Sequence, residues 1–273
     1  MNRTLVFRNF SFLPKGRQLS VTSAVNKQDL KKQHWKKDVV YLYQFPRPAV
    51  LPNFSPFCLK VETFLRVHNL KHEVIGNYFQ RSQNGLLPFV ELNGKQVADS
   101  QIILWYLQKH FEISHGVNTA EELAVVRTVD RMVSAHTNVL LQHDAVVQNA
   151  KTMLSRPVSG LMLPAFVTNY LAKGFSAKAK RRVNGVLGNL SRDDRRESLK
   201  QDIAALDAIL GDKKFLFGDR MTIADCSTFA HVGIASSLPY RQHITDLLED
   251  DFPRLRNYIQ RIRTHYFQDW KDL

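Results

Sequence analysis

In the first half of the chain, apolar and polar residues follow the pattern of a small mixed α/β domain. The β-branched and aromatic run at residues 39–45 predicts a buried strand, and HEVIG at residues 72–76 predicts a second strand. Residues 87–98 predict two further strands joined at Asn93-Gly94, because this dipeptide favours the tight turn of a β-hairpin.

Two helices are predicted beside these strands. Ser55 and Pro56 favour a helix start, and Asp99 with Ser100 caps a second helix that continues through IILWYLQKHF. The first helix is amphipathic, so it is expected to pack on the sheet. Its apolar face carries Phe57, Val61, Phe64 and Leu65, while Lys60, Glu62 and Arg66 fall on the other side.

The order strand, helix, strand, strand, strand, helix is typical of a thioredoxin-like domain on a small mixed sheet. Beyond it the helical period dominates, with amphipathic helices predicted at residues 120–146, 195–211 and 252–267. The predicted fold class is an α/β thioredoxin-like N-terminal domain followed by an all-α C-terminal domain. The expected boundaries are 1–37 for a basic extension, 38–110 for the first domain, 111–119 for a linker and 120–273 for the second domain.

Charge is unevenly distributed along the chain, which has a formal net charge of +13. Residues 145–192 contain eight basic residues and no acidic one. An apolar segment at 157–172 precedes a basic cluster at 173–182, and together they predict an interfacial helix for an anionic membrane or another anionic partner. A solvated helix surface is the alternative, since basic runs alone are weak signals. No feature predicts specific binding of nucleic acid.

The first 28 residues contain five basic residues and no acid. This composition fits either a mitochondrial targeting sequence or a basic tail, and the stable unit is expected to begin near Asp38. The sequence contains no apolar run of the length that crosses a bilayer, about 18 residues. Two cysteines cannot form a disulfide framework, which favours a reducing compartment and a cytoplasmic location, with membrane association or a mitochondrial location as alternatives.

Three motifs together resemble the glutathione transferases over roughly residues 38 to 273. They are SPFCLKV from residue 55, LLPFVELNGKQVADSQIILWYL from residue 86 and FLFGDRMTIADCSTFAH from residue 215. Within that superfamily VYLYQF, PNFSPFCLKVE, NGLLPFVELNG and FLFGDRMTIAD look like the failed-axon-connections family, including its nematode cadmium-responsive members. The metaxins, which serve mitochondrial protein import, are more distant relatives with the same two-domain plan.

The resemblance implies a site for glutathione or a related thiol. Ser55, at the position of the attacking group, would activate the bound thiol, and Cys58 is the alternative nucleophile, although a packed thiol is preferred for it. Leu87 would offer its backbone to the cysteinyl part of glutathione, beside Pro88, which resembles the cis-proline of the family. Each of these residues also has a purely structural interpretation, as a helix cap, a core thiol or an ordinary trans proline.

Further residues complete the expected site. Asp99 and Ser100 match the acid-serine pair of the family, which would bind the γ-glutamyl ammonium and carboxylate. Arg81 and Lys95 are candidate cations for the glycyl carboxylate, and His136 is either a cleft residue or, as preferred, a core histidine. Thr222 and Asp225 are interpreted as a structural capping box. The histidines and cysteines lack the spacing of a metal site, so none is expected.

The predicted function is binding of glutathione or a related thiol, with transferase or thiol-dependent chemistry in stress or in detoxification of metals or xenobiotics. The alternative is a non-catalytic adaptor or membrane-surface protein on the same fold, as in the metaxins. A small thiol ligand and a homodimer are the expected partners besides an anionic membrane surface. Nine residues between the first strand and Ser55 are a departure from the family pattern, since they either displace Ser55 or cover the site.

Overall fold

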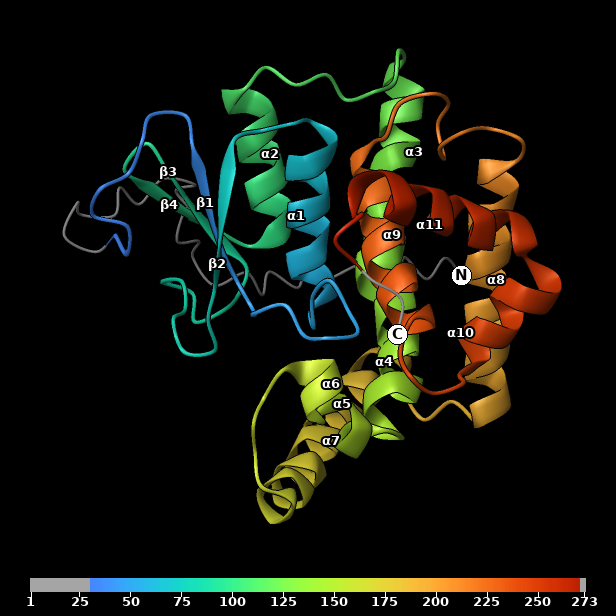
Figure 1. Cartoon of the computed structure of the whole chain (residues 1–273). Coiled ribbons are helices and arrows are strands. Elements are labelled where there is room, and N and C mark those ends of the chain that lie inside the picture. Colours follow the sequence, from blue (N-terminus) through green and yellow to red (C-terminus); the bar gives the residue numbers. More distant parts are fainter. Residues whose placement is uncertain (1–29, 271–273) are drawn as a thin grey trace, which may run out of the picture.

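The four predicted strands form one mixed sheet in the computed structural model, which describes residues 30–270 (Figure 1). The sheet order is β2-β1-β3-β4, with β1 parallel to β2 and the other two pairs antiparallel. In the turn between β3 and β4, Asn93 and Gly94 have φ angles of 50° and 78°. The strands are β1 (Val40–Gln44), β2 (His72–Gly76), β3 (Phe89–Leu92) and β4 (Lys95–Ala98).

Residues 30–37 are part of the first domain rather than of an extension. Leu30 is buried, and the backbone N–H groups of Lys31 and Lys32 donate to the Glu91 carboxylate at 2.8 and 2.9 Å. The backbone N–H of Lys36 donates to the Tyr41 hydroxyl at 2.8 Å. The expected boundary at residue 37 is therefore too late, because buried polar groups of the sheet take their partners from this segment. The expected targeting sequence or tail at residues 1–28 lies outside the described residues.

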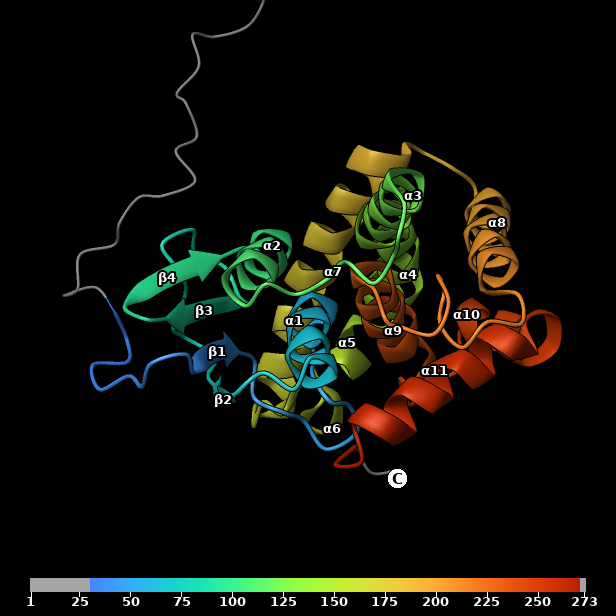
Figure 2. The same ribbon diagram turned by 90° about the horizontal axis from the view of Figure 1, so that it is seen from above.

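Helices α1 (Pro56–Val67) and α2 (Ser100–His110) lie beside the sheet, on the side of the helical domain. Viewed from above, α1 lies between the sheet and α9 (Ile223–Ser236), and it packs against α9 (Figure 2). Residues 111–119 contain no helix or strand and connect α2 to the helical domain. The predicted fold class is confirmed.

The helix predicted at residues 120–146 is continuous but not uniform. It consists of α3 (Ala120–Arg131), the π-helical η2 (Met132–Thr137), α4 (Asn138–Gln142) and the π-helical η3 (His143–Val147). The remaining helices are α5 (Ala150–Met153), α6 (Arg156–Ser159), α7 (Ala165–Leu187), α8 (Arg192–Leu210), α10 (His243–Asp246), η4 (Leu247–Asp251) and α11 (Pro253–Tyr266). None of the helices in the described part of the chain is long and apolar enough to cross a membrane.

The interfacial helix expected from the apolar segment 157–172 and the basic cluster 173–182 does not include the first residues of that segment. Gly160 has a φ of +77°, which ends α6, and a Cβ atom there would lie 2.5 Å from the Tyr78 hydroxyl. Pro164 then caps α7, which begins at Ala165 and continues to Leu187 through the basic cluster. A residue without a side chain is required at 160, so the apolar segment is divided between a loop and a longer helix.

Thr222 and Asp225 form a capping box at the start of α9. The backbone N–H and the hydroxyl of Thr222 both donate to Asp225 Oδ2 at 2.8 Å. The other carboxylate oxygen accepts from the Leu216 N–H at 2.9 Å and from the Tyr258 hydroxyl at 2.8 Å. Burial raises the pKa of Asp225, and these four hydrogen bonds oppose that shift. The carboxylate thus connects α9 to the preceding loop and to α11.

A buried ion pair connects the two domains. Lys60 of α1 and Asp130 of α3 are both fully buried, and Lys60 Nζ lies 2.5 Å from Asp130 Oδ1. The same ammonium donates to Gln101 Oε1 at 2.9 Å, and the Ser227 hydroxyl also donates to Asp130. Burial lowers the pKa of Lys60, while the charge of Asp130 opposes that shift.

Glu62 is buried as well, so the polar side of α1 does not face solvent. Its carboxylate accepts from Gln44, Arg47 and Arg66, each at 2.7 Å. Arg66 and Arg47 also pair with Asp269, and they hold the pKa of that carboxyl at about 2. The partners of Glu62 come from the first domain, whereas the helical domain supplies Asp130 to Lys60 and Asp269 to Arg66.

We predict that Lys60→Ala or Asp130→Ala lowers the free energy of unfolding by about 3–5 kcal/mol, because each leaves one buried charge without its partner. The double change Lys60→Met with Asp130→Leu should cost much less than the sum of the two. Denaturant unfolding of all three variants measures this. Lys200→Ala, which breaks the exposed pair with Asp251, is the matched control. A loss in the double variant equal to the sum of the two single losses would contradict the assignment.

Candidate functional site

Four of the residues expected to bind glutathione line one pocket. This inter-domain pocket, of about 460 Å³, lies between the loop before β3, the start of α2 and the helical domain. Leu87, Pro88, Asp99 and Ser100 all contribute to it. Its other lining residues include Phe57, Gln101, Arg131, Ser134, Arg182 and Val186.

The backbone of Leu87 is available at this pocket. The Leu87-Pro88 peptide bond is cis, and Pro88 is buried while Leu87 is partly exposed. Within residues 30–270, neither the N–H nor the C=O of Leu87 makes a hydrogen bond. A donor and an acceptor on one residue next to a strand are the groups that bind an extended peptide as an added strand.

Asp99 and Ser100 mark the start of α2. Asp99 has a φ of +75°, and its Oδ1 accepts hydrogen bonds from the N–H groups of Gln101 and Ile102 at 2.9 and 3.2 Å. The second oxygen of this exposed carboxylate has no partner among the described residues. Ser100 is the first residue of the helix, where the N-terminal N–H groups favour an anion.

The cations of the pocket come from the helical domain. Arg131 ends α3 and Arg182 belongs to α7, and neither guanidinium has an ion pair or hydrogen bond within the described structure. The two cations suggested by the sequence lie elsewhere. Arg81 lies over the Phe45 ring at 5.6 Å and Lys95 over the Tyr106 ring at 5.0 Å. Arg131 and Arg182 are recognised as the cations of this pocket only from the tertiary structure, which brings α3 and α7 next to the first domain.

Ser55 lines a second, neighbouring pocket. This apolar pocket, of about 310 Å³, is enclosed mainly by aromatic and aliphatic side chains of α1, α4, α7 and α9. Phe57 and Arg182 line both pockets, so they form the border between Ser55 and Leu87. The structure therefore places Ser55 next to the other four expected residues and not among them.

The hydroxyl of Ser55 is not used to cap α1. Ser55 is the N-cap residue in an extended conformation, and its side chain accepts no hydrogen bond from the helix N–H groups. Its own N–H donates to Asn53 Oδ1 at 2.9 Å, and Asn53 Nδ2 donates to the Phe45 carbonyl at 3.0 Å. The backbone thus positions the Ser55 hydroxyl at the apolar pocket, where its partner within the protein is the Cys58 thiol.

The long segment before Ser55 packs against the helical domain. Val50 and Leu51 are buried, the Val50 N–H donates to the Pro157 carbonyl at 3.3 Å, and the Trp270 indole donates to the Val50 carbonyl at 3.2 Å. The extra residues at 46–54 are therefore tied to α6 and to the segment after α11. They hold the start of α1 in place.

Both cysteines are buried thiols. Cys58 and Cys226 have relative exposures of 0 and 1%. Burial raises the pKa of Cys58 to about 12, against the opposing effects of a backbone hydrogen bond to Phe45 and of the Ser55 side chain. A thiol that remains protonated is a poor nucleophile. In the part of the chain that the structure describes, no group of His, Cys, Asp and Glu could hold a metal ion.

His231 is a lining residue that the sequence reasoning missed. Its Nδ1 donates to the Ser227 carbonyl at 2.8 Å, so the neutral ring presents Nε2 as an acceptor, and that atom has no partner among residues 30–270. Burial lowers the pKa of His231 to about 4. It lines the apolar pocket together with Asn138, whose Nδ2 is also without a partner in the described residues. The sequence signal that could have identified His231 is its place at the end of the motif FLFGDRMTIADCSTFAH.

His136 does not line either pocket. Its Nδ1 lies 2.9 Å from Asp202 of α8, and its side chain is partly exposed. It is therefore neither a cleft residue nor a core histidine, because η2 directs it toward α8.

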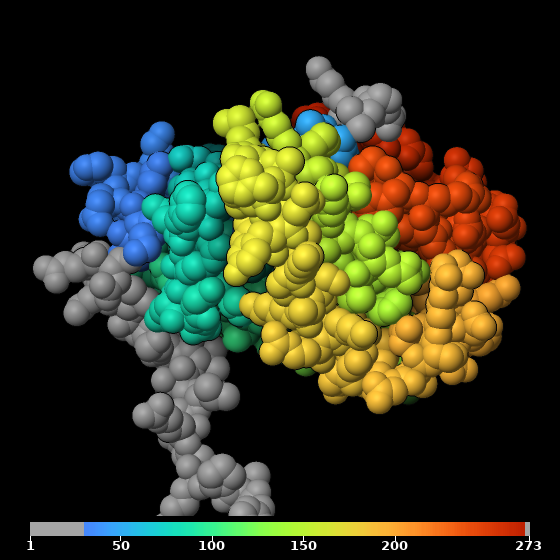
Figure 3. Space-filling view, turned by 90° about the horizontal axis from the view of Figure 1, so that it is seen from below, coloured from blue at the N-terminus to red at the C-terminus, as the bar shows by residue number. Residues whose placement is uncertain are grey.

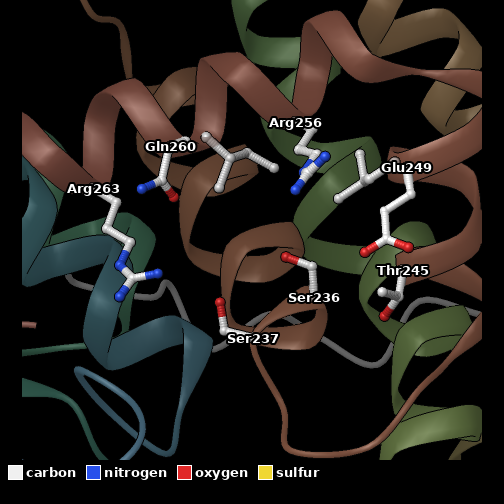
Figure 4. Close-up of a pocket in the computed structure, with 9 residues that line it drawn as sticks. Ser236, Ser237, Thr245, Glu249, Arg256, Gln260 and Arg263 are labelled. Atoms are coloured by element: carbon white, nitrogen blue, oxygen red, sulfur yellow. The ribbon is translucent and has the colours of Figure 1, made fainter. Parts of the chain in front are cut away.

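A third, polar pocket of about 190 Å³ lies within the helical domain (Figure 4). It is formed by the end of α9, by α10 with η4 and by α11. Its polar side chains include Ser236, Ser237, Thr245, Arg256 and Gln260. None of the residues expected from the sequence contributes to it, so it is separate from the inter-domain site.

Comparison with known proteins agrees with the fold. Residues 56–151 match the model of the glutathione S-transferase N-terminal domain, and residues 199–262 match that of the C-terminal domain. Failed axon connections of Drosophila melanogaster is 33% identical over an alignment of 267 residues that covers 90% of this chain. The chain spans 62% of the length of that relative.

Two other relatives are matched over nearly their whole length. The isoprene-epoxide glutathione S-transferase of Rhodococcus is 26% identical over 84% of this chain and 99% of its own length. Metaxin-2 of Mus musculus is 25% identical, over 86% of this chain and 91% of its own.

Solved glutathione transferases share the fold at lower identity. GSTFuA3 of Phanerochaete chrysosporium has a TM-score of 0.59 and 16% identity, over 85% of this chain and 99% of its own. An enzyme of Methylobacterium radiotolerans, solved with glutathione sulfonate, has a TM-score of 0.54 and 17% identity, over 86% and 95% of the two chains. With this fold and these relatives, the chain is a homologue of Failed axon connections within the glutathione transferase and metaxin-like superfamily.

Proposed function

We propose that this protein binds a thiol peptide of the glutathione class in the inter-domain pocket. The observation that carries the proposal is the unpaired backbone of Leu87 in the same pocket as two unpaired arginines. Arg131 and Arg182 are exposed and solvated, so both guanidinium groups can pair with an anion without breaking a contact within the protein. A small peptide with two carboxylates supplies both the strand-like backbone and the anions.

Each part of such a peptide has a partner of matching chemistry. The cysteinyl backbone pairs with the N–H and C=O of Leu87, and the free oxygen of Asp99 accepts from the γ-glutamyl ammonium. The γ-glutamyl carboxylate lies at Ser100, at the N-terminus of α2, where the helix dipole favours negative charge. Arg131 or Arg182 pairs with the glycyl carboxylate. The cysteinyl side chain then passes Phe57 toward Ser55.

Ser55 is the proposed group that stabilises the bound thiolate. Lowering a thiol pKa by about two units requires roughly 2.7 kcal/mol of differential stabilisation. A helix N-terminus supplies about 0.3–2 kcal/mol and a hydrogen bond to a charged group about 1.5–3 kcal/mol. Ser55 provides the hydrogen bond at the start of α1, so the two contributions together reach the required magnitude.

The apolar pocket beside Ser55 supplies room for a second, apolar reactant. It suits an electrophile with one polar group, because His231 Nε2 and Asn138 Nδ2 are an unused acceptor and an unused donor. The name of the Rhodococcus relative joins glutathione to an epoxide, which supports thiol-dependent detoxification or stress chemistry here. The alternative, a non-catalytic adaptor like the metaxins, has the same fold without turnover.

We predict that glutathione binds and that Arg131→Gln and Arg182→Gln each weaken binding by about tenfold or more, since a charge-assisted hydrogen bond is lost. Isothermal titration calorimetry measures this, with Arg81→Gln as the matched control because Arg81 lies outside the pocket. Absence of any binding to the unmodified protein would refute the proposed ligand and leave the adaptor function.

For a bound thiol, Ser55→Ala should reduce the thiolate population about ten- to a hundredfold, because a hydrogen bond worth roughly 1.5–3 kcal/mol is deleted. Glutathione affinity should change little, since the remaining contacts persist. The absorbance of the bound thiolate across a pH titration, together with turnover of a generic electrophile, measures the effect. Cys58→Ser is the control. Loss of activity in Cys58→Ser with retention in Ser55→Ala would instead indicate mixed-disulfide chemistry at Cys58.

The buried thiols give a separate prediction on pH. The pKa of Cys58 rises from 9.0 to about 12 on folding, so its contribution to stability is complete below pH 9 and is lost as the pH rises toward 12. Cys58→Ala should therefore flatten the fall of unfolding free energy in this alkaline range. Neither cysteine should react with a thiol reagent near pH 8 until the protein is denatured. Rapid labelling of the native protein would contradict the burial.

A further inference from the structure

Four large apolar side chains are almost fully solvent-exposed on one lobe of the protein. Phe79, Met162, Phe166 and Tyr170 have relative exposures of 91, 76, 75 and 79%. Single exposed apolar residues are ordinary, but a group of this size marks an interaction surface. Three of the four come from the loop before α7 and the first turns of α7, and the fourth comes from the loop after β2.

The two segments that carry these side chains are in contact. The Tyr78 hydroxyl donates to the Ser159 carbonyl at 3.0 Å, which joins the loop after β2 to the end of α6. Seen from below, α7 and the loop before it occupy the centre of the face, and the segment between β2 and β3 borders them (Figure 3). The exposed side chains thus belong to one continuous face of the molecule.

Helix α7 presents one side to the protein and the other to solvent. Ala172 and Val183 are buried, and the helix packs against α4, α5 and η3. Phe166 and Tyr170 are four residues apart, so they lie on the same side of the helix, and Lys173 continues that row. The outward side of α7 is therefore apolar in its first turns and basic after them.

The two segments that carry the exposed apolar side chains contain only positive charge. Residues 145–192 contain no acid, and neither do residues 74–90 in the bordering segment. The basic side chains nearby are exposed, and none of them makes an ion pair within the described chain. They are Lys151, Arg156, Lys173, Lys178, Lys180 and Arg181.

We propose that this face docks on an anionic lipid bilayer, with Phe79, Met162, Phe166 and Tyr170 inserted among the headgroups and the basic side chains against the anionic surface. Aromatic and aliphatic residues beside lysines on a partly exposed helix are the pattern of an interfacial helix. Lysine is depleted in protein interfaces, and a nucleic acid would leave Met162 and the other apolar side chains in water. Lipid alone satisfies both parts of the surface.

Vesicle sedimentation tests the proposal with the full chain. Binding is expected to vesicles that contain phosphatidylserine, to weaken as salt is added, and to be weak to pure phosphatidylcholine. Each neutralised lysine should lower the partition constant by about fivefold, and Lys173→Gln with Lys178→Gln and Lys180→Gln by about a hundredfold. The matched control changes Lys213, Lys214 and Arg220 to Gln, in the loop between α8 and α9 at the other end of the molecule.

Replacing the apolar side chains tests insertion separately from charge. Phe166→Ser with Tyr170→Ser should reduce binding to anionic vesicles at least about tenfold, while Val125→Ser, an exposed apolar position on α3, should not. All of these positions are solvent-exposed, so the thermal unfolding midpoint should stay unchanged. A loss of binding in the charge variant alone would mean adsorption without insertion, which contradicts the proposal.

A fluorescent label gives a direct readout of insertion. Because Cys58 and Cys226 are buried, a polarity-sensitive dye should react selectively with Phe166→Cys in the native protein. Its emission should shift to the blue on addition of anionic vesicles, whereas the same dye at Val125→Cys should not respond. Equal binding to neutral vesicles, no binding to either kind, or a change of oligomeric state in the Phe166 and Tyr170 variant would overturn the proposal.

Discussion

The ion pair between Lys60 and Asp130 is the constraint on which the arrangement of the two domains depends. Both groups are fully buried, so neither tolerates a movement that removes its partner. Since Lys60 lies on α1 and Asp130 on α3, the pair fixes the distance between the first domain and the helical domain. Gln101 and Ser227 complete the shell around it, from α2 and α9.

The same contact positions the candidate site. Gln101 lines the inter-domain pocket, and its side-chain oxygen accepts a hydrogen bond from the Lys60 ammonium at 2.9 Å. Ser134, another lining residue, lies close to the same ammonium. Arg131 directly follows Asp130, so the residue that holds the domains together also sets the position of one pocket cation. Ser134 and Ala135 of the π-helical stretch η2 and Val139 of α4 also line the pocket.

Helix α7 contributes residues both to the proposed thiol site and to the proposed membrane face. Arg182 and Val186, in its last turns, line the inter-domain pocket, whereas Phe166 and Tyr170 project from its first turns. The proposed membrane face and thiol site therefore share a helix but no residue. A protein docked through α7 would hold the border of both pockets near the lipid surface, where apolar electrophiles concentrate.

The local pattern of residues was sufficient for the strands, the Asn93-Gly94 turn and the main helices, because strand and helix periods reflect burial of one face. Motif resemblance placed Leu87, Pro88, Asp99 and Ser100 in one region, since they are close in sequence. Tertiary structure alone decided that Lys60 and Glu62 are buried, that Arg131 and Arg182 supply the cations, and that His231 faces the apolar pocket. These depend on contacts that local sequence does not encode, such as the one between Lys60 and Asp130, 70 positions apart, and on which face a second domain covers.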